Sequence, residues 1–143
     1  MSLKDKVIFI SGGSRGIGLA MVKKAAKDGA KVVIAAKTAD PHPKLPGTIY
    51  TAADEIVEAG GEALPMICDI RNEDNVRDAV NNAVDHFGGI DICINNASAI
   101  QLMPLPGLEM KRYDLMMQVN VRGTMACSKF AFPYLNDAET PPI

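Results

Sequence analysis

Glycines recur at a spacing that suits phosphate binding in the stretch ISGGSRGIG, Ile10–Gly18. The stretch follows an apolar run, KVIFI, and leads into a helical pattern, LAMVKKAAKDG. We expect Gly12 to permit a tight turn, Gly16 to let the backbone approach a ligand, and Gly18 to let the helix pack close to the sheet. Free N–H groups at the helix start would then bind phosphate. A glycine-rich turn without a ligand is the alternative, which the flanking strand and helix disfavour.

The glycine spacing also separates classes of nucleotide-binding protein. The pattern is Gly-x-x-x-Gly-x-Gly, and Leu19 and Ala20 stand where the phosphate-binding loop of a nucleoside triphosphatase has Lys and Ser or Thr. An ATPase or GTPase is therefore disfavoured. A glycine loop between the first strand and first helix of an α/β domain is instead typical of a dinucleotide site.

Charges near the end of the second predicted strand indicate which dinucleotide. A carboxylate there would accept a hydrogen bond from the ribose 2′-hydroxyl of NAD and repel a 2′-phosphate. This chain has Lys37 after the strand, no acid before Asp40, and Arg15 inside the glycine loop. Two cations without a carboxylate suit a 2′-phosphate, so we expect NADP rather than NAD. Two solvated surface cations are the alternative.

A third polar position, Asp69, follows the third predicted strand. Its carboxylate could accept a hydrogen bond from the adenine amino group of a dinucleotide. It could equally cap the turn that it forms with Arg71 and Asn72, and the chemistry of the residues alone leaves both interpretations open.

Apolar runs that alternate with helical patterns must position these residues. Four strand–helix units in series predict an α/β fold of the Rossmann type, a doubly wound parallel sheet with right-handed crossovers. In the first helix, Ile17, Ala20, Met21 and Ala25 lie at helical spacing, and Pro133 should kink or end the last helix. The predicted strands are Val7–Ser11, Lys31–Ala36, Ala63–Cys68 and Asp91–Asn95. The predicted helices are Arg15–Asp28, Thr48–Ala59, a helix capped by Asn72 that runs to about Phe87, and one from about Met110 toward Leu135.

The length and composition of the chain limit the number of domains and the classes of partner that we expect. The 143 residues suit one domain, 1–143, and the net charge of -2 disfavours nucleic-acid and membrane-surface binding. No apolar run reaches the ~20 residues that span a bilayer, and the start MSLKDK leaves no room for a signal peptide before the first strand. Three widely spaced cysteines predict free thiols in a reducing compartment, the cytoplasm. His42 and His86 are isolated, so we expect no metal site.

Four segments together resemble the short-chain dehydrogenase/reductase family. SGGSRGIG is similar to its Thr-Gly-x-x-x-Gly-x-Gly loop, with Ser11 in place of Thr, and CDIRNED places Asp69 where the family contacts adenine. INNASAI is similar to its Asn-Asn-Ala-Gly motif, with Ser98 in the glycine position. MMQVNVRGT places Asn120 where the family keeps a catalytic-site asparagine. The stretch Ile34–Ile56 resembles the hydroxysteroid dehydrogenase-like branch and its bacterial relatives.

The resemblance implies roles for individual residues. In that branch the loop glycines, Lys37 and Asp69 bind NADP. The family's catalytic-site asparagine, here Asn120, distorts its helix and holds a water for a proton relay; an exposed helical asparagine is the alternative. Asn95 and Asn96 are interpreted as hydrogen-bonding groups at the end of the sheet. The candidate cofactor-binding residues are Ser11, Gly12, Gly13, Ser14, Arg15, Gly16, Ile17, Gly18, Lys37, Asp69, Ile70, Asn96, Ala97 and Ser98.

The family's acid–base pair, Tyr-x-x-x-Lys, does not occur in these residues. Four positions after Tyr50, Tyr113 and Tyr134 stand Asp54, Met117 and Ala138. We therefore expect the N-terminal, NADP-binding part of a longer oxidoreductase that acts on a small carbonyl or alcohol and forms a dimer or tetramer, with the helix after Met110 as a candidate seam. A non-catalytic dinucleotide-binding module and an interaction subunit remain as alternatives.

Overall fold

Four parallel strands form the sheet in the computed structural model, which describes residues 2–43 and 46–136. The strand order is β3-β2-β1-β4, so the chain moves outward from β1 to β3 and then crosses to the other side of β1. This order confirms the predicted α/β fold with a doubly wound sheet. The strands are β1 (Val7–Ser11), β2 (Lys31–Ala36), β3 (Glu62–Ile67) and β4 (Ile92–Asn95). The helices are α1 (Gly16–Ala26), α2 (Ile49–Glu58), α3 (Glu73–Phe87), η1 (Leu105–Gly107), α4 (Met110–Met117), η2 (Gln118–Gly123) and α5 (Thr124–Asn136).

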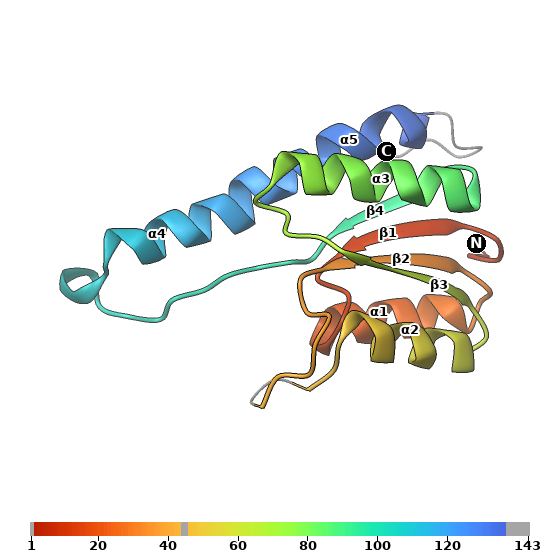
Figure 1. Ribbon diagram of the computed structural model, residues 1–143, viewed down its shortest axis with the longest axis horizontal. Helices are drawn as coiled ribbons and strands as arrows, with labels where there is room; N and C mark the ends of the chain where they lie inside the picture. Colours follow the sequence, from red (N-terminus) through yellow and green to blue (C-terminus); the bar gives the residue numbers. More distant parts are fainter. Residues whose placement is uncertain (1, 44–45, 137–143) are drawn as a thin grey trace.

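Helices cover both faces of the sheet (Figure 1). Helices α1 and α2 pack on the face that carries Ile8 and Ile10, whereas α3 and α5 pack on the face that carries Val7 and Phe9. Every residue of β1 is buried, as expected for a central strand between two helical layers. The parallel register aligns Ser11 with Ala35 of β2 and with Asn95 of β4. The carboxyl ends of these strands therefore meet at one edge of the sheet.

Local signals account for where several helices begin and end. Thr48 caps α2 in a capping box with Thr51, with each hydroxyl accepting a hydrogen bond from the other residue's N–H. Asn72 caps α3 as predicted, since its side chain accepts a hydrogen bond from the N–H of Asn75 at 3.1 Å. Gly88 ends α3 with φ of 87°, a conformation that glycine adopts without strain.

Helix α1 forms as its spacing predicts, but not all of the apolar residues at that spacing face the sheet. Ala25 is buried, but Ile17 is 77% exposed and Met21 is 38% exposed. The residues of α1 that face the sheet are Gly18, Val22, Ala25 and Ala26. The reason is that Gly18 lies against the backbone of the glycine loop, and this contact sets the rotation of the helix about its axis.

The last predicted helix is interrupted. A π-helical segment, η2, separates α4 from α5, so the chain has two α-helices where periodicity indicated one. Pro133 does not end the helix, because α5 continues to Asn136. A proline removes one N–H donor, and a single missing bond near the last described turn leaves the remaining bonds of α5 in place. The polar, proline-bearing tail after Asn136, in which its sequence predicts no strand, lies outside the described residues.

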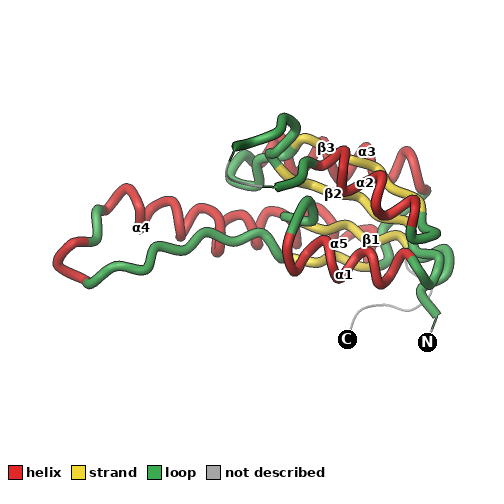
Figure 2. The backbone as a smooth tube through the Cα atoms, turned by 90° about the horizontal axis from the view of Figure 1, so that it is seen from below, coloured by secondary structure: helices red, strands yellow, loops and turns green. Residues whose placement is uncertain are grey.

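One segment extends away from the layered body. The loop that follows β4, the short turn η1 and helix α4 together form an arm (Figure 2). No residue of α4 is buried, and Leu102 and Leu105 are also exposed. Within the described residues, no helix combines the length and apolar character needed to cross a membrane.

Candidate functional site

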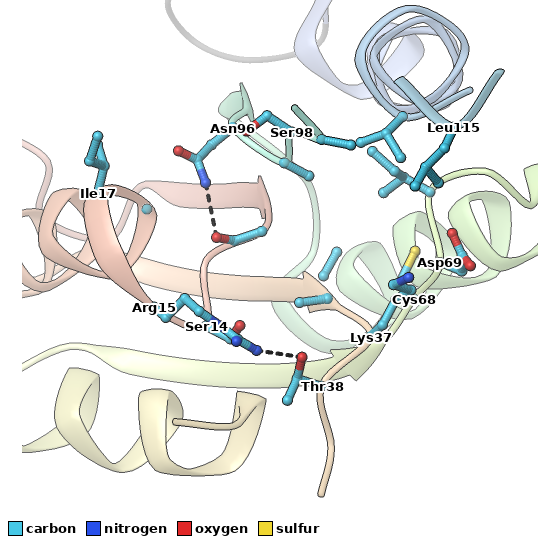
Figure 3. Close-up of a pocket in the computed structure, with 18 residues that line it drawn as sticks. Ser14, Arg15, Ile17, Lys37, Thr38, Cys68, Asp69, Asn96, Ser98 and Leu115 are labelled. Atoms are coloured by element: carbon cyan, nitrogen blue, oxygen red, sulfur yellow. Dashed lines mark hydrogen bonds between the residues drawn. The ribbon is translucent and has the colours of Figure 1, made fainter. Parts of the chain in front are cut away.

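A cavity of about 550 Å³ opens where the strands end (Figure 3). The glycine loop, the end of β2, the turn after β3, the segment after β4 and helix α4 all contribute to it. The structure therefore brings together candidate residues from distant parts of the sequence. The candidates that line it are Gly12, Ser14, Arg15, Ile17, Gly18, Lys37, Asp69, Ile70, Asn96, Ala97 and Ser98. Ser11, Gly13, Gly16 and Asn120 do not line it.

The three loop glycines lie in two kinds of environment. At Gly12 and Gly18 a side chain would collide with neighbouring atoms, whereas at Gly16 it would extend into open space. Gly12 has φ of 71°, and a Cβ there would lie 2.8 Å from the Cα of Ala97. Gly16 has φ of 55°, and among the described residues no atom beyond its neighbours in the chain lies within 4 Å of the point where a Cβ would stand, so its backbone faces open space. At Gly18, a Cβ would lie 2.6 Å from the carbonyl oxygen of Gly12. Gly12 thus makes a tight turn and Gly18 packs closely, as expected, and Gly16 leaves its backbone facing open space.

Hydrogen bonds tie the glycine loop to the segment that follows β4. The buried Ser11 hydroxyl accepts from the backbone N–H groups of Asn96 and Ala97, both at 3.2 Å. In return the Asn96 side chain donates to the carbonyl oxygens of Ser11 at 3.3 Å and Gly12 at 2.9 Å. Asn95 donates to the Ser128 hydroxyl at 3.0 Å. Both asparagines are thus hydrogen-bonding groups at the sheet end: Asn96 holds the glycine loop, and Asn95 bonds to α5.

The two cations expected to select the dinucleotide both line the cavity. The guanidinium of Arg15 donates to the hydroxyl of Thr38 at 2.5 Å, whereas the side chain of Lys37, which follows β2, points toward Cys68 and Asp69 (Figure 3). Lys37 is exposed, so its ammonium group is accessible to a ligand. Sequence reasoning missed Thr38, although a hydroxyl that directly follows Lys37 was a signal that could have included it.

Asp69 adopts the turn-capping arrangement. Its carboxylate accepts from the Arg71 backbone N–H at 3.1 Å and from the Arg71 Nε at 2.9 Å, and its carbonyl accepts from the N–H of Asn72. These hydrogen bonds from Arg71 hold the pKa of the Asp69 carboxyl below its ordinary value, and the positive charge of Lys37 acts in the same direction. Because Asp69 also lines the cavity, capping the turn leaves a charged carboxylate beside the space for a ligand.

Asn120 lies within η2, outside the lining of the cavity. Its Oδ1 accepts from the N–H of Ala99 at 2.9 Å, and its Nδ2 donates to the carbonyl oxygen of the same residue at 2.9 Å. The side chain is exposed yet has both polar atoms paired, so it is not the simple solvated asparagine of the alternative. The π-helical segment around it agrees with the helix distortion that the resemblance implies.

The cavity also has an apolar wall that sequence reasoning missed. Leu115 of α4 and Val119 of η2 face it one helical turn apart, and Ala35, Ala36 and Cys68 lie at the strand ends. Burial raises the pKa of the Cys68 thiol to about 11, and the neighbouring Asp69 charge adds to this shift. The apolar spacing of Leu115 and Val119 was visible, but only the fold shows that it faces the glycine loop.

Known proteins match this chain along nearly all of its length. It is 61% identical to hydroxysteroid dehydrogenase-like protein 2 of Danio rerio over 136 residues, which are 95% of the chain and 33% of the relative. The human protein of the same name is 58% identical over the same length. The chain therefore spans about a third of the length of these curated relatives.

Solved structures of dehydrogenases and reductases have the same fold as this chain. A putative dehydrogenase from Xanthomonas campestris superimposes with a TM-score of 0.96 at 55% identity, covering 99% of this chain and 52% of that protein. The NADH-dependent reductase A1-R' complexed with NAD superimposes with a TM-score of 0.82 at 31% identity, covering 94% of this chain and 54% of that protein. The family model for short chain dehydrogenases matches residues 6–142. The chain belongs to the short-chain dehydrogenase family.

Proposed function

We propose that residues 1–143 form the NADP-binding domain, and the N-terminal part, of a short-chain oxidoreductase. The observation that carries this proposal is the cavity at the sheet end, which the glycine loop, Lys37 and Asp69 line together. The geometry fits a dinucleotide, because the backbone at Gly16 faces open space and α1 begins there without a side-chain cap on its first N–H groups. When bound, the nicotinamide would exchange a hydride with a carbonyl or a secondary alcohol.

The preference for NADP rests on charges that line the cavity. Arg15 and Lys37 offer two cations where the adenosine ribose would lie, and the first acid after β2 is Asp40. A 2′-phosphate would gain charge-assisted hydrogen bonds from both. The reductase bound to NAD among the structural relatives shares only 31% identity, so we base the preference on the residues of this chain.

The remaining residues of the proposed site hold the ligand in place. Ser11, Gly13 and Ser14 shape the loop, Ile17 and Ile70 supply apolar contacts, and the backbone of Asn96, Ala97 and Ser98 forms the far wall. Asn120 is the catalytic-site candidate within the chain. A π-helical turn departs from the regular hydrogen-bond ladder, and such a departure offers a place to hold the water of a proton relay.

The substrate class, the oligomeric state and the cellular compartment follow from the family and from the composition of the chain. We propose a small carbonyl or alcohol substrate, no nucleic-acid partner in view of the net charge of -2, and a homo-oligomer. Cys68, Cys93 and Cys127 are free thiols, which suits a reducing compartment such as the cytoplasm. A non-catalytic dinucleotide-binding module remains the second candidate, because Tyr-x-x-x-Lys does not occur in these residues; a steady-state assay with carbonyl substrates separates the two.

Titration with NADPH and NADH, followed by nucleotide fluorescence, tests the proposal. We expect Arg15→Ala and Lys37→Ala each to weaken NADPH binding by roughly tenfold, the size of one lost charge-assisted bond, with NADH binding changed less than about twofold. Lys24→Ala removes the same charge from the exposed side of α1 and should change neither affinity. Equal losses for both nucleotides would contradict the NADP preference, and no binding of either would contradict the dinucleotide site.

A further inference from the structure

The π-helical segment η2 lies directly against one wall residue of the cavity. Gly123 is buried, and a Cβ at this position would lie 2.5 Å from the Cδ1 and 2.7 Å from the Cγ1 of Ile70. Both distances are far below van der Waals contact, so the two segments approach this closely only because residue 123 has no side chain. Gly123 belongs to η2, whereas Ile70 belongs to the turn between β3 and α3, far earlier in the sequence.

Ile70 stands between Gly123 and the ligand space. It is only 6% exposed and belongs to the core cluster under α3 and α5, yet it also lines the cavity beside Asp69. Any group added at residue 123 must therefore displace either the helix or Ile70. The core on the remaining sides is densely packed, whereas the cavity is open, so the easier displacement of Ile70 is into the cavity.

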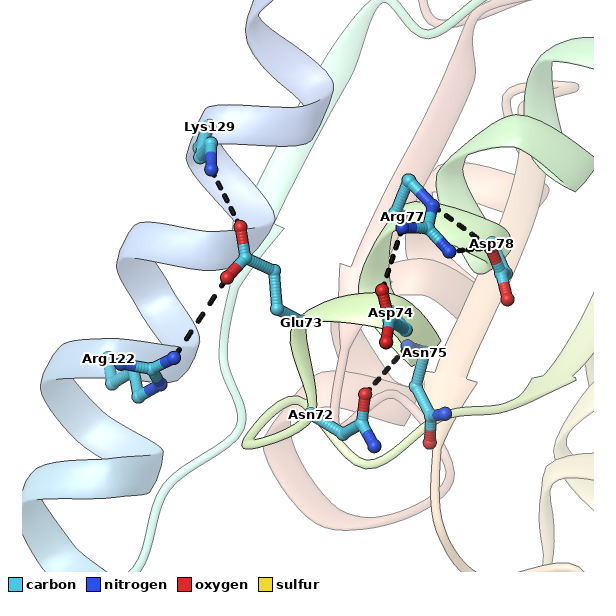
Figure 4. Close-up of polar contacts among 8 residues, drawn as sticks. All are labelled: Asn72, Glu73, Asp74, Asn75, Arg77, Asp78, Arg122 and Lys129. Atoms are coloured by element: carbon cyan, nitrogen blue, oxygen red, sulfur yellow. Dashed lines mark hydrogen bonds and ion pairs between the residues drawn. The ribbon is translucent and has the colours of Figure 1, made fainter.

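The backbone of η2 is anchored at several points and cannot withdraw easily. Asn120 is held by its two hydrogen bonds to the backbone of Ala99. On the other side, Glu73 at the start of α3 accepts from Lys129 of α5 at 2.6 Å and pairs with Arg122 of η2 at 3.9 Å (Figure 4). These contacts tie η2 to the segment after β4 and tie α5, which directly follows η2, to the start of α3. Strain from a larger residue at position 123 would thus pass to Ile70.

We propose that Gly123 is a positioning residue for the adenosine half of the cavity, acting through Ile70. Its missing side chain lets Ile70 remain against the helix, which leaves room beside Asp69 for the adenine ring. The inference rests on the proposed function, since it takes the Asp69 end of the cavity as the adenine end. Gly123 touches no part of the ligand space itself, because it is not among the lining residues.

A double-mutant cycle with NADPH and with 2′,5′-ADP as the adenosine-half probe tests the proposal. We expect Gly123→Ala to weaken the binding of both probes by roughly tenfold, a change within the range of overpacking costs. Ile70→Ala removes the Cγ1 and Cδ1 atoms that a residue-123 methyl would meet. The double variant should therefore bind both probes within about threefold of Ile70→Ala alone, which is strong non-additivity.

Two controls separate positioning from a general loss of stability. Gly89→Ala places a methyl where nothing lies within 4 Å, so its affinities should equal those of the wild type. Val80→Ala opens space in the core at a residue that is 1% exposed and outside the cavity lining. It should lower the melting temperature and leave both affinities unchanged while the protein is folded. A positioning role moves the affinity for 2′,5′-ADP, whereas a purely structural role does not.

The outcomes distinguish a failure of the Gly123 role from a failure of the proposed dinucleotide binding. Wild-type affinity in Gly123→Ala, or a double variant as weak as Gly123→Ala despite tight binding by Ile70→Ala, would overturn the inference and leave the proposed function standing. If Gly123→Ala does not fold, the double variant alone decides, with recovered folding and binding supporting the role and their loss overturning it. A wild-type protein that binds neither probe nor NADH would overturn the proposed function and, with it, this inference.

Discussion

Asp69 keeps its charge because of its immediate neighbour. Hydrogen bonds from Arg71 hold the pKa of the Asp69 carboxyl below the ordinary value of 3.8, and so this group binds protons less readily in the folded state than in the unfolded state. A lowered folded-state pKa stabilises the fold above the ordinary pKa, and the stabilisation disappears as the pH falls through the folded-state value.

The stabilisation by the ionised Asp69 carboxylate should be visible in the pH dependence of the free energy of unfolding. We expect Asp69→Asn to lower the free energy of unfolding by about 1–2 kcal/mol near neutral pH, with the difference from the wild type shrinking once the pH falls below about 4. Urea unfolding at a series of pH values measures it. Asp54→Asn, on the exposed side of α2, is the matched control and should show no such trend. A difference that persists unchanged into strong acid would contradict the role of the Asp69 charge.

The cysteine thiols should be chemically inert in the native protein. Burial raises the pKa of Cys68 and of Cys93 to about 11 and that of Cys127 to about 12, so few thiolates exist at neutral pH. We expect iodoacetamide to modify none of the three at a measurable rate until denaturant is added, after which all three react. Intact-mass spectrometry counts the adducts. Rapid labelling of native Cys68 would show that the cavity exposes this thiol.

At the scale of secondary-structure elements, α1 depends on the closeness of its first turn to the glycine loop. Alanine usually stabilises a helix relative to glycine by about 1 kcal/mol. At Gly18 we expect alanine to destabilise the protein instead, because the added Cβ would lie 2.5 Å from the Asn96 Nδ2 and 2.6 Å from the Gly12 carbonyl oxygen. A backbone oxygen cannot turn aside as a flexible side chain can.

We therefore expect Gly18→Ala to destabilise the fold by about 1–3 kcal/mol, the usual cost of overpacking. Chemical denaturation followed by circular dichroism gives the value. Gly89→Ala, at a site with open space, should change stability by less than about 0.5 kcal/mol. Gly18→Ala with wild-type stability would mean that α1 can shift away from the loop at little cost.

At the scale of the whole molecule, an apolar surface runs from the arm to the start of α5. We call it the α4 stripe; its side chains recur every three or four residues and are at least 41% exposed. Its members are Met110, Tyr113 and Met117 of α4, Val121 of η2 and Met125 of α5. This regular surface is the physical basis for placing the proposed oligomer seam at the helix after Met110.

Sedimentation velocity over a range of concentrations tests that seam. We expect the protein to sediment as a dimer or tetramer, and Met117→Glu to shift it toward the monomer, because a charge in the middle of the α4 stripe would have to be desolvated. Gln118→Glu adds the same charge at the next position, outside the stripe, and should leave association intact. A monomeric wild type, or equal effects of both substitutions, would place the seam elsewhere or exclude it.

The alternation of strands and helices, the glycine loop and the capping of α3 by Asn72 could all be predicted from the sequence. These features depend on neighbouring residues, on hydrophobic periodicity and on the conformational freedom of glycine, and so they are legible in a short window. A preference for NADP over NAD could likewise be predicted from Arg15 and Lys37, because the ends of parallel strands must meet at one edge of the sheet.

The contacts between residues that are distant in the sequence could be known only from the fold. The Arg15–Thr38 bond joins residues 23 positions apart, and the bond from Asn96 to Gly12 joins residues 84 positions apart. The rotation of α1 was decided in the same way, since the contact at Gly18 overrode the apolar spacing of Ile17. Such contacts depend on dense packing between layers, which no local pattern encodes.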